Sequence, residues 1–141
     1  MTPLVIRRAE PADKARLIEI CVAAQAQAFP NWTSDMRTAA EFDAQTRGEE
    51  IWATLQDNRA VGMASLFRPR RFLHHLYVDP AFQGGGVGRA LLAHAIAASG
   101  GRLALKCDVD NRRACGFYQA MGMRPAAWGW APTGPWIRFV R

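Results

Sequence analysis

Long apolar runs, lysine and paired cysteines are all scarce in this sequence. The longest apolar candidate, ALLAHAIAA, contains His94 and is far shorter than the ~18 residues that a membrane-spanning helix needs. Near the N-terminus, three apolar residues are followed by Arg7 and Arg8, which predicts that no signal peptide is present. We therefore expect a protein of the cytoplasm that does not enter a membrane.

Cysteine is limited to Cys21, Cys107 and Cys115, an odd number with no CxxC pair. Such a set excludes a disulfide framework and fits a reducing compartment. Cys107 and Cys115 have no histidine partner in a catalytic motif, so buried structural thiols are favoured over an acyl-cysteine nucleophile. The histidines also lack metal-ligand spacing, so we expect no metal.

Basic residues outnumber acidic ones by 18 to 12, and only Lys14 and Lys106 of the 18 are lysines. A polyanionic ligand, either nucleic acid or a phosphorylated cofactor, would favour such a balance. An arginine bias over a solvated surface would do so equally well. The densest cluster, Arg68 to Arg71, is short and lacks aromatic neighbours, so it predicts a hairpin tip rather than a nucleic-acid site.

The chain of 141 residues, half of them hydrophobic, is long enough for one domain (1–141) and too short for two. No internal repeat, linker or low-complexity segment interrupts it. The patterns predict helices over 10–29, 35–48, 87–99 and 111–122. They predict strands over 4–10, 71–78 and 102–109, with hairpins over 50–67 and 123–141.

The order of these elements predicts an α/β (α+β) fold. Strands joined by short turns should be antiparallel, whereas the helical crossover between Phe72 and Asp108 should make its two strands parallel. A mixed, mostly antiparallel sheet with helices on its faces follows. His74 and His75 are neighbours in a strand, so alternation predicts that they point to opposite faces.

A glycine-rich turn, QGGGVG, stands between a predicted strand and a predicted helix. Such a turn leaves backbone N–H groups free at the helix start and suits a phosphate group, although a loop without a ligand stays an alternative. Arg89 in the first turn is unfavourable unless an anion lies nearby. Gly88 is followed by Arg89 and Ala90, not by the lysine of a P-loop, and the third glycine of a dinucleotide fingerprint is missing.

Two separated motifs carry a resemblance to a known family. Residues 83–88 match Q/R-x-x-G-x-G/A, and residues 111–122 match N-x-x-A-x-x-F-Y-x-x-x-G. Together with the element order along the whole chain, they make the sequence similar to the GCN5-related N-acetyltransferases (the GNAT family). The resemblance implies the GNAT fold, in which two parallel strands splay apart.

The resemblance also implies acetyl-CoA as the acyl donor. The glycine-rich turn would hold its pyrophosphate, and the end of the preceding strand would pair with the pantetheine arm through its backbone. Asn111 would contact that arm or cap its own helix. The cofactor-binding residues implied in this way are Tyr77, Val78, Gln83, Gly84, Gly85, Gly86, Val87, Gly88, Arg89 and Asn111.

For catalysis, the resemblance implies Tyr118 as the general acid, because it matches a tyrosine that many family members use. The alternative for Tyr118 is packing beside Phe117. The central strand offers no clear acidic base, so His74 and His75 are the candidates, and a structural role or a water relay stays open.

We therefore expect an N-acetyltransferase that moves an acetyl group from acetyl-CoA directly to a primary amine of a small molecule or peptide. The alternative is a non-catalytic CoA-binding regulatory module with the same fold. Nucleic acid and membrane partners are not expected, and a homodimer is left open. Aromatic residues could line the acceptor pocket: Trp32, Trp128, Trp130 and Trp136.

Overall fold

The computed structural model describes residues 3–141, which form a seven-stranded mixed sheet and four α-helices. The strands are β1 (Val5–Arg8), β2 (Glu50–Gln56), β3 (Arg59–Phe67), β4 (Phe72–Val78), β5 (Ala104–Asp108), β6 (Arg124–Ala131) and β7 (Gly134–Val140). The helices are α1 (Lys14–Ala28), α2 (Ala39–Gln45), α3 (Val87–Ala98) and α4 (Arg112–Ala120). The strand order is β1-β2-β3-β4-β5-β7-β6, and only β4 and β5 are parallel.

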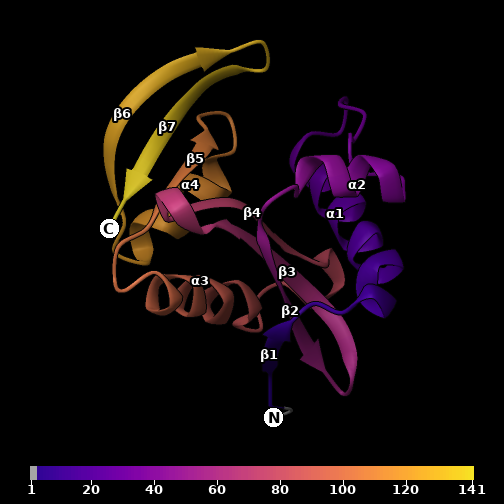
Figure 1. The fold of residues 1–141 in the computed structure, drawn as a ribbon. Coiled ribbons are helices and arrows are strands. Elements are labelled where there is room, and N and C mark those ends of the chain that lie inside the picture. Colours follow the sequence, from indigo (N-terminus) through magenta and orange to yellow (C-terminus); the bar gives the residue numbers. More distant parts are fainter. Residues whose placement is uncertain (1–2) are drawn as a thin grey trace.

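The sheet separates two pairs of helices (Figure 1). On the α1 face, α1 packs against β3 and β4, and α2 packs against α1. On the α3 face, α3 packs against β3 and β4, and α4 packs against β5. Each face buries its own apolar cluster, with Ile20 and Phe42 on the α1 face and Leu91 and Leu105 on the α3 face. The predicted mixed sheet with helices on both faces is confirmed.

Local signals explain the element ends. The β2–β3 hairpin, which lies within the hairpin predicted over 50–67, turns at Asp57 and Asn58, both with positive φ. α2 begins at Ala39, later than predicted, because Thr38 and Glu41 form a capping box. The box satisfies free N–H groups at the helix start and typically contributes about 1 kcal/mol.

β3 passes under the first turn of α3 at Gly62. A Cβ at this position would lie 2.8 Å from Val87 Cγ1 and 3.1 Å from Leu91 Cδ1, closer than carbon atoms pack. Only glycine therefore allows α3 to lie this near the sheet. The contact fixes the start of α3 and with it the glycine loop, residues 83–88, whose last two residues begin the helix.

A β-bulge interrupts β4 at His74. Ser65 of β3 pairs with His75, and Leu66 pairs with Leu73, which leaves His74 as an extra residue. The prediction that the two histidines point to opposite faces is wrong, because the bulge breaks the alternation of the strand. Their rings lie side by side instead, with centroids 3.8 Å apart.

None of the helices in residues 3–141 has the length and apolar character needed to cross a membrane.

Candidate active site

β4 and β5 run side by side for only a short distance. They pair at two positions, Phe72 with Ala104 and Leu73 with Leu105, and then separate. β5 continues along β7, whereas the rest of β4 faces a gap where its backbone groups have no ladder partner in β5. The predicted splayed pair of parallel strands is confirmed.

A groove of about 900 Å³ lies at this gap, lined by parts of α1, β4, the glycine loop, β5 and α4. The catalytic candidates His74, His75 and Tyr118 line it. So do most of the predicted cofactor-binding residues: Tyr77, Val78, Gln83, Gly84, Gly86, Val87, Gly88, Arg89 and Asn111. Gly85 does not line it.

The glycine loop forms one end of the groove. Gly84 and Gly86 have φ values of 85° and 86°, which favour glycine, and a Cβ on either would meet no atom within 4 Å. Gly86 is the N-cap of α3, whose first-turn N–H groups have no acceptor within the helix. Arg89 lies in that turn and forms no ion pair within residues 3–141. This end of the groove can therefore hold a phosphate group.

Gln83 ties the glycine loop to its neighbours. Its Nε2 donates hydrogen bonds to Gln27 Oε1 at 2.8 Å and to the Val78 carbonyl at 3.3 Å. Tyr77, next to Val78, is held through its side chain, because its hydroxyl accepts a hydrogen bond from Gln25 Nε2 at 3.0 Å. A ligand in the groove would therefore meet the backbone of Tyr77 rather than its hydroxyl.

Tyr118 of α4 packs beside Phe117 and Phe139, with ring centroids 5.3 and 5.9 Å away. Burial raises the pKa of Tyr118 above its ordinary value of 10. Its hydroxyl therefore stays protonated at neutral pH and can serve as a proton donor.

Asn111 caps α4, since its Oδ1 accepts a hydrogen bond from the Ala114 N–H at 3.2 Å. The predicted capping role is confirmed, whereas contact with a cofactor stays a prediction.

Two cysteines meet between β5 and α4. The sulfur atoms of Cys107 and Cys115 are 3.4 Å apart, and the Cys115 thiol also contacts the Asp108 carbonyl. Burial raises the pKa of Cys107, which keeps it a thiol at neutral pH. Because the thiolate is the nucleophilic form, this arrangement favours the predicted structural role.

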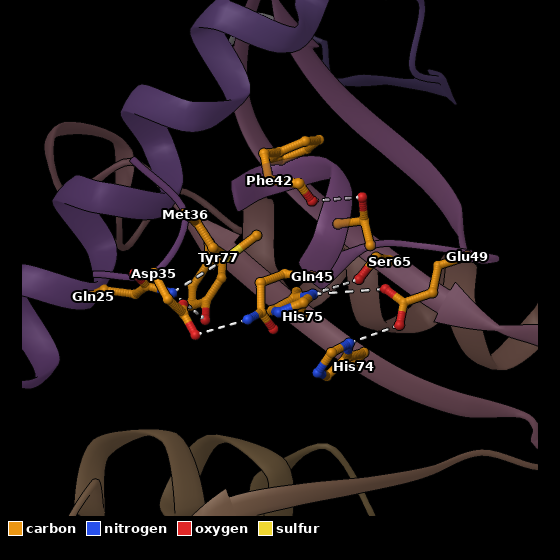
Figure 2. A network of polar contacts seen from close by, with 11 residues as sticks. Gln25, Asp35, Met36, Phe42, Gln45, Glu49, Ser65, His74, His75 and Tyr77 are labelled. Atoms are coloured by element: carbon orange, nitrogen blue, oxygen red, sulfur yellow. Dashed lines mark hydrogen bonds and ion pairs between the residues drawn. The ribbon is translucent and has the colours of Figure 1, made fainter. Parts of the chain in front are cut away.

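Four polar side chains gather on the α1 face beside the groove: Glu49, Ser65, His74 and His75 (Figure 2). We call them the Glu49 cluster. His74 Nδ1 lies 2.6 Å from Glu49 Oε2, and His75 Nδ1 lies 2.8 Å from Ser65 Oγ. Glu49 Oε1 is 3.8 Å from His75 Nδ1, too far for a hydrogen bond, and has no donor within residues 3–141.

The charge of Glu49 fixes the proton in its pair with His74. Burial alone would raise the pKa of Glu49, but its contacts with His74 and His75 outweigh burial and leave this pKa at about 2. An ionised carboxylate only accepts hydrogen bonds, so His74 Nδ1 is the donor. Burial lowers the pKa of His75, which therefore favours its neutral form.

The two histidines differ in access to solvent. The side chain of His74 is 39% exposed and that of His75 is 7% exposed. Figure 2 shows the second ring nitrogen of His74 turned away from Glu49. His74 is therefore the histidine that a molecule in the groove can reach.

Comparison with known proteins assigns the chain to a family. Residues 17–123 match the model of the acetyltransferase (GNAT) family, a span that holds the glycine loop, β4 and α4. The chain belongs to the GNAT family. Its predicted resemblance to that family is confirmed.

Three GNAT relatives illustrate the match. An aminoglycoside N(6')-acetyltransferase type 1 of Stenotrophomonas maltophilia is 30% identical, over 86% of this chain and 95% of that protein. N-alpha-acetyltransferase 40 of Saccharomyces cerevisiae is 34% identical over 52% of this chain and 30% of that protein. The PaiA N-acetyltransferase of Thermoplasma acidophilum, solved in complex with coenzyme A, superposes with a TM-score of 0.79 at 15% identity, over 96% of this chain and 98% of that one.

These matches differ in extent. The chain spans about a third of the length of two of the curated relatives and nearly all of the aminoglycoside enzyme. The structural similarity at low identity shows that the fold is shared.

The GNAT motifs in the sequence did not point to Glu49. It stands just before β2, two residues ahead of Ile51, which pairs with Ser65 of β3. A correct register for the β2–β3 hairpin would have placed Glu49 on the face of Ser65. The bulge that turns His74 toward Glu49 left no recognisable pattern in the sequence.

Of the four tryptophans suggested for an acceptor pocket, only Trp32 lines the groove. Trp128 and Trp130 are 66% and 81% exposed on β6, and Trp136 lies beneath the ammonium group of Lys106.

Proposed function

We propose that this GNAT protein is an acetyl-CoA-dependent enzyme that transfers the acetyl group directly to a primary amine. One observation carries the proposal: a single groove between splayed strands has free helix N–H groups at one end and both a tyrosine and a histidine on its walls. Bound acetyl-CoA would supply the thioester. The protein would supply alignment, a proton donor and a proton acceptor.

The residues present suit this donor. Gly84 and Gly86 line the groove, and a Cβ on either would meet no atom within 4 Å, so there is room for a pyrophosphate beside the N–H groups of this loop. The unpaired edge of β4 at Tyr77 and Val78 suits the amide-bearing pantetheine arm. The structure of the Thermoplasma relative, described as a complex with coenzyme A, supports this assignment.

Transfer to a protonated amine requires proton movements at two atoms. The amine nitrogen must lose protons, and the sulfur must gain one as the C–S bond breaks. Tyr118 keeps its proton at neutral pH and lines the groove, so we assign it as the donor to sulfur. His74 and His75 are the candidates for the acceptor of the amine proton.

Direct transfer is favoured over an acyl-cysteine route. Cys107 lines the groove, but burial raises its pKa, and no histidine is bonded to it in residues 3–141.

The acceptor is best sought among amines like those of the named relatives. An aminoglycoside, a peptide with a free N-terminus and a polyamine would form a suitable first panel. We expect release of coenzyme A thiol, detected with a thiol reagent, with at least one of them. Tight acetyl-CoA binding without thiol release across a broad amine panel would instead indicate a regulatory CoA-binding module.

A further inference from the structure

We propose that Glu49 and His74 form a proton-accepting pair, in which His74 Nε2 takes the proton of the acceptor amine and Glu49 holds the ring. The inference rests on the proposed function and names the base for it. His74 would act as the catalytic residue and Glu49 as a positioning residue.

The position of His74 in the sheet supports this assignment. Leu73 is the last residue of β4 that pairs with β5, so His74 stands where the two strands separate. The bulge at His74 frees it from the β3 register and turns its side chain to the α1 face. The ring is 39% exposed and lines the groove.

The contact with Glu49 selects one tautomer of His74. Its Nδ1 donates to the carboxylate at 2.6 Å, so the neutral ring carries its lone pair on Nε2, the nitrogen turned away from Glu49 (Figure 2). The nearby anion also stabilises the positive charge that the ring gains with a proton. The same division of work operates between aspartate and histidine in serine protease triads.

The buried part of the cluster holds Glu49 in place. The side chain of Glu49 is 8% exposed. Ser65 lies on β3, between β2 and β4, and its small side chain leaves room for the Glu49 carboxylate to approach His75. Other titratable groups near the cluster are Tyr77 of β4, whose ring centroid lies 5.8 Å from that of His75, and Asp35 ahead of α2, while Lys106 of β5 lines the same groove. Because the His75 pKa is lowered by burial, His75 favours its neutral form and adds little charge that would repel a protonated His74.

The protons balance for an acceptor that enters as an ammonium ion, which has three N–H bonds where the amide product has one. His74 Nε2 takes the first proton and passes it to solvent, and the neutral nitrogen then forms the new C–N bond. Tyr118 gives its proton to the sulfur as the C–S bond breaks. The nitrogen loses its second proton after the C–N bond has formed, and this proton offsets the one that Tyr118 gave, so one proton in all is released to solvent.

The kinetic test compares His74→Gln and Glu49→Gln with the unmodified enzyme, using whichever panel amine turns over fastest. At pH 7 we expect kcat to fall about 10²–10⁴-fold for His74→Gln and about 10²-fold for Glu49→Gln, with acetyl-CoA affinity unchanged. Both losses should shrink as the pH approaches the pKa of the amine, because an amine that is already neutral needs no base. A loss of equal size at every pH would show a structural role and overturn the proposal.

Matched controls are available in the same chain. His94→Gln removes a histidine that packs on Trp52, and Glu50→Gln removes a carboxylate paired with Arg68. Both variants should retain normal kcat. A loss in these controls as large as in His74→Gln would also contradict the specific pair.

Two further measurements do not depend on turnover. Nitrogen NMR of the imidazole rings should show Nδ1 of His74 protonated and Nε2 unprotonated in the neutral ring; the opposite tautomer would overturn the proposal even if no amine were accepted. Two imidazoles and a carboxylate within 4.8 Å are also ligands that zinc accepts. Activity that a chelator abolishes and zinc restores would make these residues metal ligands instead, whereas chelator resistance supports the pair.

Discussion

The two parts of the groove are built in different ways. The glycine loop comes from consecutive residues, 83–88, and offers mainly backbone N–H groups at the start of α3. The Glu49 cluster comes from the residue before β2, from β3 and from β4, and offers side chains that a bulge brings together. The glycine loop depends on local sequence, whereas the Glu49 cluster depends on strand register. Substitutions should therefore affect the two sites differently.

The largest effect of a single change outside the Glu49 cluster is expected at Tyr118. Tyr118→Phe keeps the ring beside Phe117 and Phe139 and removes only the proton donor. We expect kcat to fall about 10²–10⁴-fold, with acetyl-CoA affinity nearly unchanged. Pre-steady-state rates check it: an unchanged chemical step would make Tyr118 a packing residue.

A backbone-built binding site should lose affinity rather than rate when its glycines are replaced. Gly86→Ala places a methyl group over the proposed pyrophosphate position, and we expect acetyl-CoA binding to weaken by about tenfold, or ~1.4 kcal/mol. Calorimetric titration measures this change.

Gly101→Ala is the matched control for Gly86→Ala. Its φ of 87° equals that of Gly86 within a degree, and its Cβ also meets open space. Both variants therefore carry the same backbone strain of about 1–2 kcal/mol, but only Gly86 lines the groove. Equal acetyl-CoA affinities in the two variants would contradict the assignment of the pyrophosphate to the glycine loop.

The buried histidine should make stability depend on pH, whereas the glycine loop should not. Burial lowers the pKa of His75 below its ordinary value of 6.5, so the unfolded chain binds more protons just below that pH. The free energy of unfolding should therefore decrease as the pH falls below 6.5, until it passes the lowered pKa.

Urea unfolding at several pH values tests the dependence. We expect a shallower slope of unfolding free energy against pH for His75→Gln than for the unmodified protein. Comparing slopes keeps the test valid even if His75→Gln is less stable at every pH. An identical slope in the two proteins would show that His75 does not favour its neutral form.

The smallest effect on catalysis is expected for the cysteine pair. Replacing Cys107 and Cys115 with alanine removes a packed contact, and we expect a stability loss of about 1–2 kcal/mol with kcat nearly unchanged. Thermal unfolding measures the stability loss, and steady-state kinetics measure kcat. A folded double variant that binds acetyl-CoA but has no activity would favour an acyl-cysteine route.

The sequence predicted the fold and the glycine loop because their signals are local. Glycines with open space around them, helix caps such as Asn111 and the helical crossover after β4 can each be recognised within a short window. The start of α2 at Ala39 could also have been predicted from the sequence, since Thr38 and Glu41 have capping-box spacing.

The Glu49 cluster could not be predicted in the same way. Its geometry depends on how three strands are aligned and on one extra residue in β4. A bulge shifts every later side chain of a strand to the other face, and no residue type marks its position in this segment. Strand alternation therefore predicted opposite faces for His74 and His75, and it gave no sign that Glu49 would contact either of them.

The close packing at Gly62 makes β3 a spacer beneath the glycine loop. A methyl group there would push Val87 and Leu91 outward and raise the first turn of α3 above the sheet. For protein engineering, position 62 therefore offers control over the height of the loop without altering any residue that lines the groove. Graded changes at this one site, paired with a smaller residue at position 91, would tune the fit of the groove to acyl donors of different size.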